Sequence, residues 1–454
     1  MRLWLFPHGS LVTQGASPFG QLPGNEAAAI AIIELANGAR MPDPILFISA
    51  GEASGEAYGA LLIAALRKKL QSLGRQAEFV GMGGPRMVEA GLDRIVRAED
   101  VAVMGITEVV RHLPQIYREF RKLKRAVRER RPSIAILIDF PDIHFKLAEE
   151  FHRLEIPVLF FVSPQLWAWK KHRIKLVQKY VDRMLVIFPF EEPFYRERGV
   201  NAEFVGHPLA DLPLPATSRE KFAAEHGLDP GKTWIALLPG SRAKEIRANL
   251  PEMIRAAALL SDSARDRPLQ FIVPLAPTLT GPQRLAVQAL VDQFRENLDP
   301  RMVGAEGAVD PTAGGALFHA RASIVASGTA TVEAALIGNP FVVVYRVSPL
   351  TYAIAKRVVD VPHIAMANLI AGKRIVPELI QSDFTAANIV QHLAPLLPDG
   401  PPRQSMMQEL QRVRALLSVR QNQPGEPSGA IDRVADLALE VLGIASPAVE
   451  SVQS

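Results

Sequence analysis

Cysteine is absent from this chain of 454 residues. The absence excludes disulfides, thiolate metal sites and a thiol nucleophile, and it fits a reducing compartment. No apolar run approaches the roughly 18 uncharged residues that a membrane-spanning helix needs. We therefore expect a protein of the cytoplasm that does not cross a bilayer.

Net charge is also nearly lacking, because the formal value is only +4. It gives no reason to expect a nucleic-acid partner. Positive charge nevertheless gathers between residues 117 and 131, where Phe120, Leu123 and Val127 recur at helical spacing. The segment predicts an amphipathic helix with a basic face. Two interpretations stay open: a solvated helix face, or attraction to anionic lipid or an anionic substrate.

Hydrophobic residues make up 48% of the chain and charged residues 22%, which is the composition of a well-packed soluble protein. From Ile45 onward, short β-rich runs alternate with longer helical patterns, which is typical of parallel sheets built from βαβ units. The sequence thus predicts an α/β fold with two Rossmann-like domains facing a cleft. The first set of predicted strands comprises residues 45–49, 78–81, 134–139, 158–162 and 184–187, and the second comprises residues 234–238, 269–273, 323–326 and 341–345.

Proline and glycine clusters mark the predicted domain boundaries. Residues 1–43 lack a recurring pattern, so we expect a poorly ordered extension or a mis-assigned start, with Met41 as the alternative first residue. The helical tail near the end is expected to pack back on the first domain or onto a partner chain, which leaves a homodimer open. The predicted parts are a first Rossmann-like domain at 44–208, a linker at 209–232, a second Rossmann-like domain at 233–396, the helical tail at 397–444 and a disordered end at 445–454.

Two loops of small residues, 239–242 and 327–331, follow predicted strands of the second domain. Backbone N–H groups in such loops can approach an anion, and the following helix dipole favours negative charge. Glu333 suits ribose hydroxyls, and Arg242 supplies a counter-charge for phosphate. Neither loop is a Walker A motif, since no Gly-Lys-Ser/Thr closes it. We predict a nucleotide diphosphate site formed by Gly240, Ser241, Arg242, Ser327, Gly328, Thr329, Ala330 and Glu333.

The first predicted strand ends in a glycine-rich turn that contains Gly51, Glu52, Ser54 and Gly55. Its spacing departs from the G-x-G-x-x-G pattern of dinucleotide-binding proteins, which disfavours a dehydrogenase. Glycines also permit a tight strand-to-helix turn without any ligand. The turn is therefore either structural or part of a pocket for a sugar or acyl group.

Asp139 and Asp142 stand at the end of the apolar run 134–138. Open α/β sheets bind ligands at this end of their strands. A carboxylate there is a candidate general base that takes a proton from an attacking hydroxyl. The alternative, an aspartate that caps the next helix, fits Asp142 better than Asp139.

Trp167 and Trp169 precede a basic cluster that begins at Lys170. Indole rings bury apolar surface while cations bind phosphate, so the segment suits an amphiphile with an anionic head. Ordinary core and surface packing is the alternative. The histidines show no spacing typical of a zinc site, so we predict no metal.

Taken in order, eight segments closely resemble the lipid-A-disaccharide synthase family. The resemblance implies a GT-B type fold. It also implies transfer of 2,3-diacylglucosamine from its UDP derivative to 2,3-diacylglucosamine 1-phosphate, with a β(1→6) disaccharide and UDP as products. The segments are residues 49–59, 81–87, 103–109, 138–142, 163–169, 188–191, 239–242 and 327–333.

The resemblance also implies roles for individual residues. It makes Asp139 the preferred base and Arg242 the counter-charge of the departing diphosphate, and it adds Asn368 to the UDP contacts. Family members usually have proline immediately before that asparagine, whereas Ala367 stands here. The implied reaction inverts the anomeric carbon and needs no metal or other cofactor.

Acylated substrates place such an enzyme at the inner face of the inner membrane. The apolar stretch 101–113, with Met104 near its centre, adjoins the basic segment. We expect it either to enter the membrane interface or to pack in the core. Rival interpretations are a peptidoglycan-precursor N-acetylglucosaminyltransferase, a UDP-N-acetylglucosamine 2-epimerase and a non-catalytic nucleotide-sugar or lipid-binding module.

Overall fold

The computed structural model describes residues 43–101, 106–263, 268–277, 279–293, 298, 300–304, 312–348, 352–353, 357, 361–419 and 429–444. Every element named below lies within one unit, Ile45–Ser454. The predicted extension, except for its last residue, and the predicted disordered end lie outside the described residues. Met104 also lies outside them.

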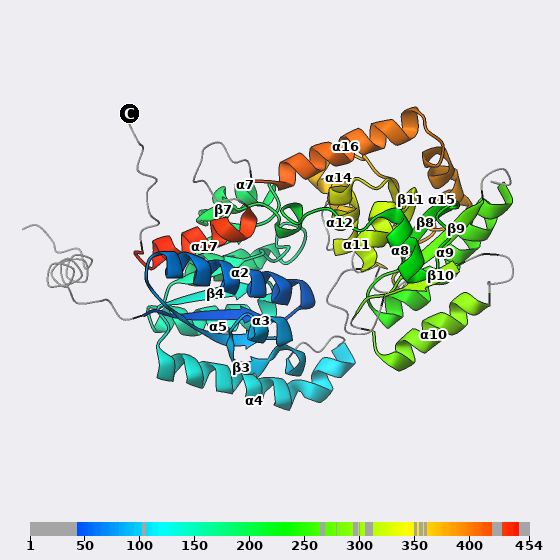
Figure 1. Ribbon diagram of the computed structural model, residues 1–454. Helices are drawn as coiled ribbons and strands as arrows, with labels where there is room; N and C mark the ends of the chain where they lie inside the picture. Colours follow the sequence, from blue (N-terminus) through cyan, green and yellow to red (C-terminus); the bar gives the residue numbers. More distant parts are fainter. Residues whose placement is uncertain are drawn as a thin grey trace, which may run out of the picture. The chain divides into compact units, whose positions relative to one another are not determined.

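The first sheet has seven parallel strands in the order β3-β2-β1-β4-β5-β6-β7 (Figure 1). Its centre is formed by β1, β4 and β5, whose residues are almost all buried, as expected for parallel strands covered on both faces. The prediction missed β3 and β7 at the two edges. The strands are β1 (Ile45–Ala50), β2 (Glu78–Gly83), β3 (Asp93–Arg97), β4 (Ile134–Ile138), β5 (Val158–Phe161), β6 (Arg183–Val186) and β7 (Ala202–Phe204).

Alternate side chains of β1 face opposite layers of helices. Leu46 and Ile48 join the hydrophobic cluster that contains α2 (Ala53–Ser72), whereas Phe47 joins the cluster that contains α4 (Ile106–Arg130) and α5 (Pro141–Arg153). This alternation follows from the two-residue period of a strand. The shorter helices of this half are α3 (Pro85–Glu89), α6 (Ile174–Tyr180) and α7 (Glu191–Arg196).

The second sheet has six parallel strands in the order β10-β9-β8-β11-β12-β13. The predicted strands are all present, and β10 and β13 at the edges were missed. The strands are β8 (Thr233–Leu238), β9 (Leu269–Pro274), β10 (Pro300–Val303), β11 (Ala322–Ala326), β12 (Phe341–Tyr345) and β13 (Glu378–Ile380). The helices are α9 (Ala243–Ser263), α10 (Gly281–Asp292), α11 (Thr312–His319), α12 (Thr329–Ile337), α14 (Met366–Ala371) and α15 (Ala386–Leu393).

The predicted linker contains a helix, α8 (Arg219–His226). Phe222 of this helix is buried against Trp234 at the start of the second sheet, with ring centroids 6.2 Å apart. The Arg219 guanidinium lies 3.5 Å from the Trp234 ring centroid. The second half of the predicted linker therefore packs as part of the second lobe, because it carries apolar surface that a free linker lacks.

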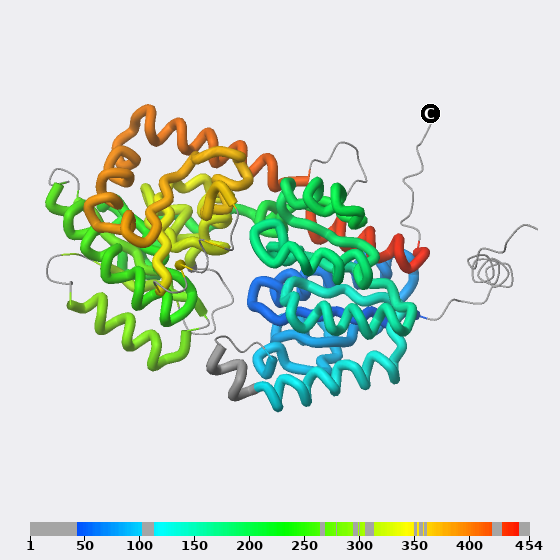
Figure 2. Tube along the Cα trace, turned by 180° about the vertical axis from the view of Figure 1, so that it is seen from behind, coloured from blue at the N-terminus to red at the C-terminus, as the bar shows by residue number. Residues whose placement is uncertain are grey.

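The two C-terminal helices pack on different lobes. α16 (Pro401–Leu417) packs on α12 and α14, and α17 (Ala430–Val441) packs on α2 of the first half, where both views place the red helix beside the blue one (Figure 1 and Figure 2). A salt bridge of 2.7 Å joins Lys69 to Asp436. The backbone N–H of His207, which precedes the linker, also donates to the carbonyl of Leu417 at the end of α16. The segment that leaves the first lobe is thereby hydrogen-bonded to the segment that returns to it. The tail thus packs back within the chain, and exchange with a partner stays a prediction.

None of the helices within the described ranges is long and apolar enough to cross a membrane.

Candidate active site

Asp139 begins a strained turn directly after β4. Asp139 has φ +51° and Phe140 has φ +53°, so two consecutive residues with side chains adopt the left-handed conformation. Strain of this kind persists only where the surroundings enforce it, and it concentrates at functional sites. The Phe140 ring lies over Gly51, where an added Cβ would come within 2.4 Å of the ring. Gly51 is therefore required for this close approach.

The turn is anchored by a buried histidine that the sequence analysis did not select for this role. His144 Nδ1 lies 2.5 Å from the Asp139 carbonyl oxygen, and its Nε2 lies 2.8 Å from the Ser49 hydroxyl. Both His144 and Ser49 are completely buried. The Ser49 partner is 95 residues away in the sequence, so this role of His144 becomes visible only in the folded chain.

The Asp139 carboxyl has a raised pKa of about 6. Burial is the main cause, and the charge of Glu52 adds to it, while the Phe140 backbone N–H partly opposes the rise. Glu52 therefore lies close enough to affect Asp139, although the two come from different strand ends. A carboxyl with a pKa near neutrality is well placed to act as a general base.

The first predicted phosphate loop follows β8. Gly240 has φ +118°, and a Cβ there would lie 2.6 Å from a Glu245 oxygen. The Ser241 N–H donates to Glu245 over 3.2 Å, and Arg242 pairs with the same carboxylate over 3.2 Å. Donors predicted to bind diphosphate thus already bind an anion, the carboxylate of Glu245. The sequence analysis did not select Glu245.

The second predicted loop joins β11 to α12. Gly328 and Thr329 are exposed, and Ser327 and Ala330 are partly exposed. The Thr331 hydroxyl donates to the Gly328 carbonyl over 2.7 Å, which fixes the first turn of the helix. The N–H groups at the start of α12 are therefore directed at an accessible surface, as an anion site requires.

Glu333 lies one turn further along α12 and is mostly shielded from solvent. Burial raises the pKa of its carboxyl to about 7. An added Cβ at Gly314 would lie 3.1 Å from its Oε1, so α11 approaches this carboxyl closely. A desolvated acceptor of this kind suits hydroxyl donors such as those of ribose.

Tyr58 is a buried phenol near predicted site residues of both lobes, and the sequence analysis did not select it. Its side chain is buried in α2, and its pKa is raised by burial and then by the charges of Asp139 and Glu333. Asp139 follows β4 of the first lobe and Glu333 lies in α12 of the second, so carboxyls from both lobes raise the pKa of the same phenol. The predicted base, Asp139, and the predicted ribose-binding residue, Glu333, therefore both lie close enough to Tyr58 to raise its pKa.

Asn368 differs from its predicted role. Its side chain is fully buried, its Oδ1 accepts from the N–H groups of Ile375 and Val376, and its Nδ2 donates to Glu378. The side chain has no surface left for a direct contact with UDP. It instead holds the loop after α14 in place, and the alanine at 367 is also buried.

A sequence profile described as lipid-A-disaccharide synthetase matches residues 46–427. The chain belongs to this family. The lipid-A-disaccharide synthase of Acidobacterium capsulatum is 60% identical over 406 residues, which are 88% of this chain and 96% of that protein. That of Koribacter versatilis is 47% identical over 397 residues, which are 87% of this chain and 98% of that protein. The chain is accordingly a glycosyltransferase.

Solved structures agree on the fold. The Staphylococcus aureus MnaA–UDP co-structure aligns with a TM-score of 0.57 at 12% identity and covers 88% of this chain and 98% of that one. The calicheamicin glycosyltransferase CalG4 aligns with a TM-score of 0.52 at 18% identity and covers 90% of this chain and all of that one, 100%. The two parallel-sheet α/β lobes thus form a GT-B type fold in this family member.

The two predicted tryptophans have different environments. Trp167 donates to Glu191 over 2.9 Å and packs edge-on against Phe190, whereas Trp169 is 42% exposed and carries the Lys170 ammonium 4.1 Å from its ring centroid. Burial raises the pKa of Glu191 to about 7, although it accepts three hydrogen bonds. Trp169 presents the largest exposed surface of the three to an acyl chain or an anionic head, while Trp167 and Lys170 are partly exposed.

The other predicted acceptor-side residues lie near Asp139. Gly55 is buried, and a Cβ there would lie 3.6 Å from the Ile138 carbonyl oxygen, so α2 begins against the end of β4. Ser54 is partly exposed in the same turn. Asp142 does not cap α5 with its side chain and instead forms a 2.7 Å salt bridge with Arg173. Across the residues that the structure places, no group of three or more histidines and carboxylates suits a metal ion.

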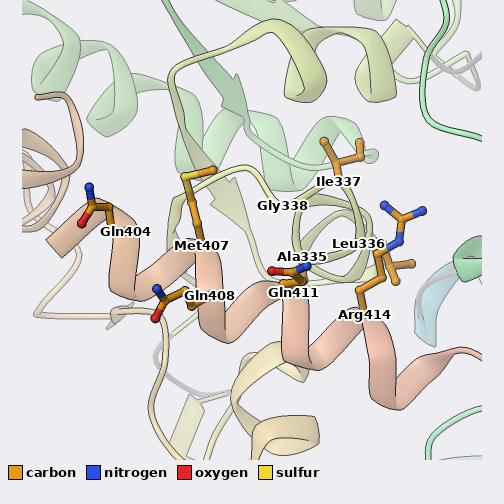
Figure 3. Close-up of a pocket in the computed structure, with 9 residues that line it drawn as sticks. All are labelled: Ala335, Leu336, Ile337, Gly338, Gln404, Met407, Gln408, Gln411 and Arg414. Carbon is orange, nitrogen blue, oxygen red and sulfur yellow. The ribbon is translucent and has the colours of Figure 1, made fainter. Parts of the chain in front are cut away.

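A separate pocket of about 410 Å³ lies between the last turn of α12 and α16 (Figure 3). Its polar lining comes from Gln404, Gln408, Gln411 and Arg414, and Met407 contributes an apolar side chain. None of the predicted site residues lines it. The pocket therefore belongs to the opposite end of α12 from the predicted anion site.

Proposed function

We propose that the chain transfers 2,3-diacylglucosamine from UDP-2,3-diacylglucosamine to 2,3-diacylglucosamine 1-phosphate, with release of UDP. The family and its curated relatives support this reaction. Asp139 accepts the proton of the acceptor 6-hydroxyl as that oxygen attacks the anomeric carbon from the face opposite UDP. The linkage formed is therefore β(1→6).

The departing UDP takes up negative charge. Arg242 and the N–H groups at the start of α12 stabilise that charge, and Glu333 accepts from the ribose hydroxyls. Glu245 releases Arg242 and Ser241 as the diphosphate takes its place. Chain residues thus supply both the base and the anion-stabilising donors that an inverting transfer needs.

The observation that carries this proposal is the strained turn after β4, in which Asp139 and Phe140 both have positive φ and the His144 ring holds the Asp139 carbonyl. The second lobe contributes the accessible start of α12 and the shielded Glu333 carboxyl. A base and a nucleotide-binding carboxyl from separate lobes are what a two-substrate transferase requires. A module that only bound nucleotide would need the second lobe alone.

The acyl chains of both substrates place the enzyme at the inner-membrane surface on its cytoplasmic side. The N-terminal part of α4 supports this placement, since Leu113 is 56% and Tyr117 is 62% exposed. Arg118 and Arg121 lie beside them, and the Arg118 side chain remains exposed although it pairs with Glu119. An amphipathic helix with exposed apolar residues beside cations suits an anionic lipid interface.

The decisive experiment supplies labelled donor with each candidate acceptor. We expect a disaccharide product and equimolar UDP with diacylglucosamine 1-phosphate, identified by mass spectrometry. Transfer of N-acetylglucosamine to a lipid-linked peptidoglycan precursor would support the rival transferase. Epimerised UDP-sugar without acceptor would support the epimerase. UDP-sugar binding with no turnover on any acceptor would favour the non-catalytic module.

A further inference from the structure

His144 is a buried titratable residue that the proposed reaction does not use. It belongs to the first turns of α5, five residues after Asp139, and it has no solvent-exposed surface. Its imidazole bridges the Ser49 hydroxyl of β1 and the Asp139 carbonyl. The group thus lies between the centre of the sheet and the candidate base.

The two hydrogen bonds fix the tautomer of the ring. A backbone carbonyl can only accept, so Nδ1 of His144 carries the proton and donates to Asp139. Nε2 is therefore the acceptor, and the Ser49 hydroxyl donates to it. Burial lowers the pKa of His144 to about 4, so the ring stays neutral at neutral pH.

One residue holds both carbonyls of the strained turn. The His144 side chain binds the Asp139 carbonyl, and the His144 backbone N–H donates to the Phe140 carbonyl over 3.2 Å. The Phe140 ring also packs edge-on against the imidazole, with centroids 5.8 Å apart. Two successive left-handed residues are disfavoured on their own, so contacts of this kind must maintain them.

We propose that His144 is a positioning residue for catalysis: its neutral imidazole, held by Ser49, locks the Asp139–Phe140 turn and so aims the Asp139 carboxylate at the acceptor hydroxyl. The proposal rests on the base role of Asp139. It adds that catalysis requires His144 to fix the conformation of the Asp139–Phe140 turn. His144 itself touches no substrate.

The test replaces His144 by three residues that differ in whether they can donate a hydrogen bond to the Asp139 carbonyl. In His144→Asn the amide nitrogen stands two bonds beyond Cβ, as Nδ1 does, so the bond to the Asp139 carbonyl is retained. In His144→Gln the nitrogen stands one bond further out, and in His144→Leu no donor remains. We expect kcat to fall about a hundredfold in the Leu and Gln variants, as a misplaced catalytic group predicts, and to recover in the Asn variant.

Binding measurements separate positioning from general damage. UDP contacts lie in the second lobe, so calorimetry should give the same UDP affinity for all three variants, and KM for the donor should stay unchanged while kcat falls. A protonated Nδ1 in the ¹⁵N spectrum of the wild type is a further expected result, and it does not depend on activity or on variant folding.

Three outcomes would overturn the proposal: full kcat in His144→Leu, no recovery in a folded His144→Asn variant, or an Nε2-protonated ring. Failure of the underlying function is distinguishable. An Asp139→Asn enzyme with normal turnover would remove the base role whatever the state of His144. An inactive Asp139→Asn enzyme together with a fully active His144→Leu enzyme would reject only the positioning role.

Discussion

Replacing Asp139 by asparagine is expected to lower kcat without destabilising the fold. Asparagine tolerates the left-handed conformation that Asp139 adopts, so the turn can keep its shape. The variant cannot accept a proton as a base, and kcat is expected to fall by roughly 10² to 10⁴. Asp142→Asn is the matched control, because this nearby carboxylate is exposed and paired with Arg173. It should retain wild-type turnover.

The same change is expected to stabilise the fold at neutral pH. The pKa of Asp139 rises from its ordinary value of 3.8 to about 6, mainly because ionisation is costly in a buried place. Between these values the folded chain holds the proton more often than the unfolded chain, so the free energy of unfolding falls as pH rises. Above pH 6 this cost reaches an upper limit of about 3 kcal/mol. Asparagine does not ionise and therefore avoids this cost.

Thermal unfolding of both proteins from pH 4 to pH 8 measures this difference, with initial rates recorded on the same samples. The Tm of Asp139→Asn should match the wild type near pH 4 and exceed it increasingly up to about pH 6. The wild-type rate should fall as pH drops below about 6, since the base is then protonated. Turnover of the variant above a tenth of wild type, or a Tm difference independent of pH, would refute the reasoning.

Three further predictions address the second lobe and the membrane. Arg242→Ala should weaken UDP binding roughly 10- to 100-fold in calorimetry, as loss of a charged hydrogen bond predicts, whereas Arg247→Ala at an exposed position of the following helix, α9, should not. UDP affinity should rise with pH from 6 to 8 as Glu333 ionises, and Glu333→Gln should show a flatter profile; equal slopes would exclude its ribose role. Replacing Leu113 and Tyr117 together by Ser should lower co-sedimentation with anionic vesicles at unchanged Tm, and unaltered partitioning would contradict the α4 surface.

The buried strands were predictable because parallel strands covered on both faces are continuous apolar runs. The runs at 134–138 and 234–238 illustrate this, and both are strands in the structure. β3 was missed because an edge strand faces solvent, and only two of its residues from Asp93 to Arg97, Ile95 and Val96, are apolar. The helix within the predicted linker was missed because its eight residues carry little periodic signal.

The sequence by itself determined the alternation of strands and helices, the two loops of small residues and the position of Asp139 at a strand end. These features depend on local patterns, which a chain carries without folding. Only the tertiary structure decided that Asn368 is buried and that Glu245 occupies the donors of the first loop. It also brought Ser49 and His144, 95 residues apart, into one hydrogen bond. Such pairings depend on the order of the strands in the sheet, which local composition does not specify.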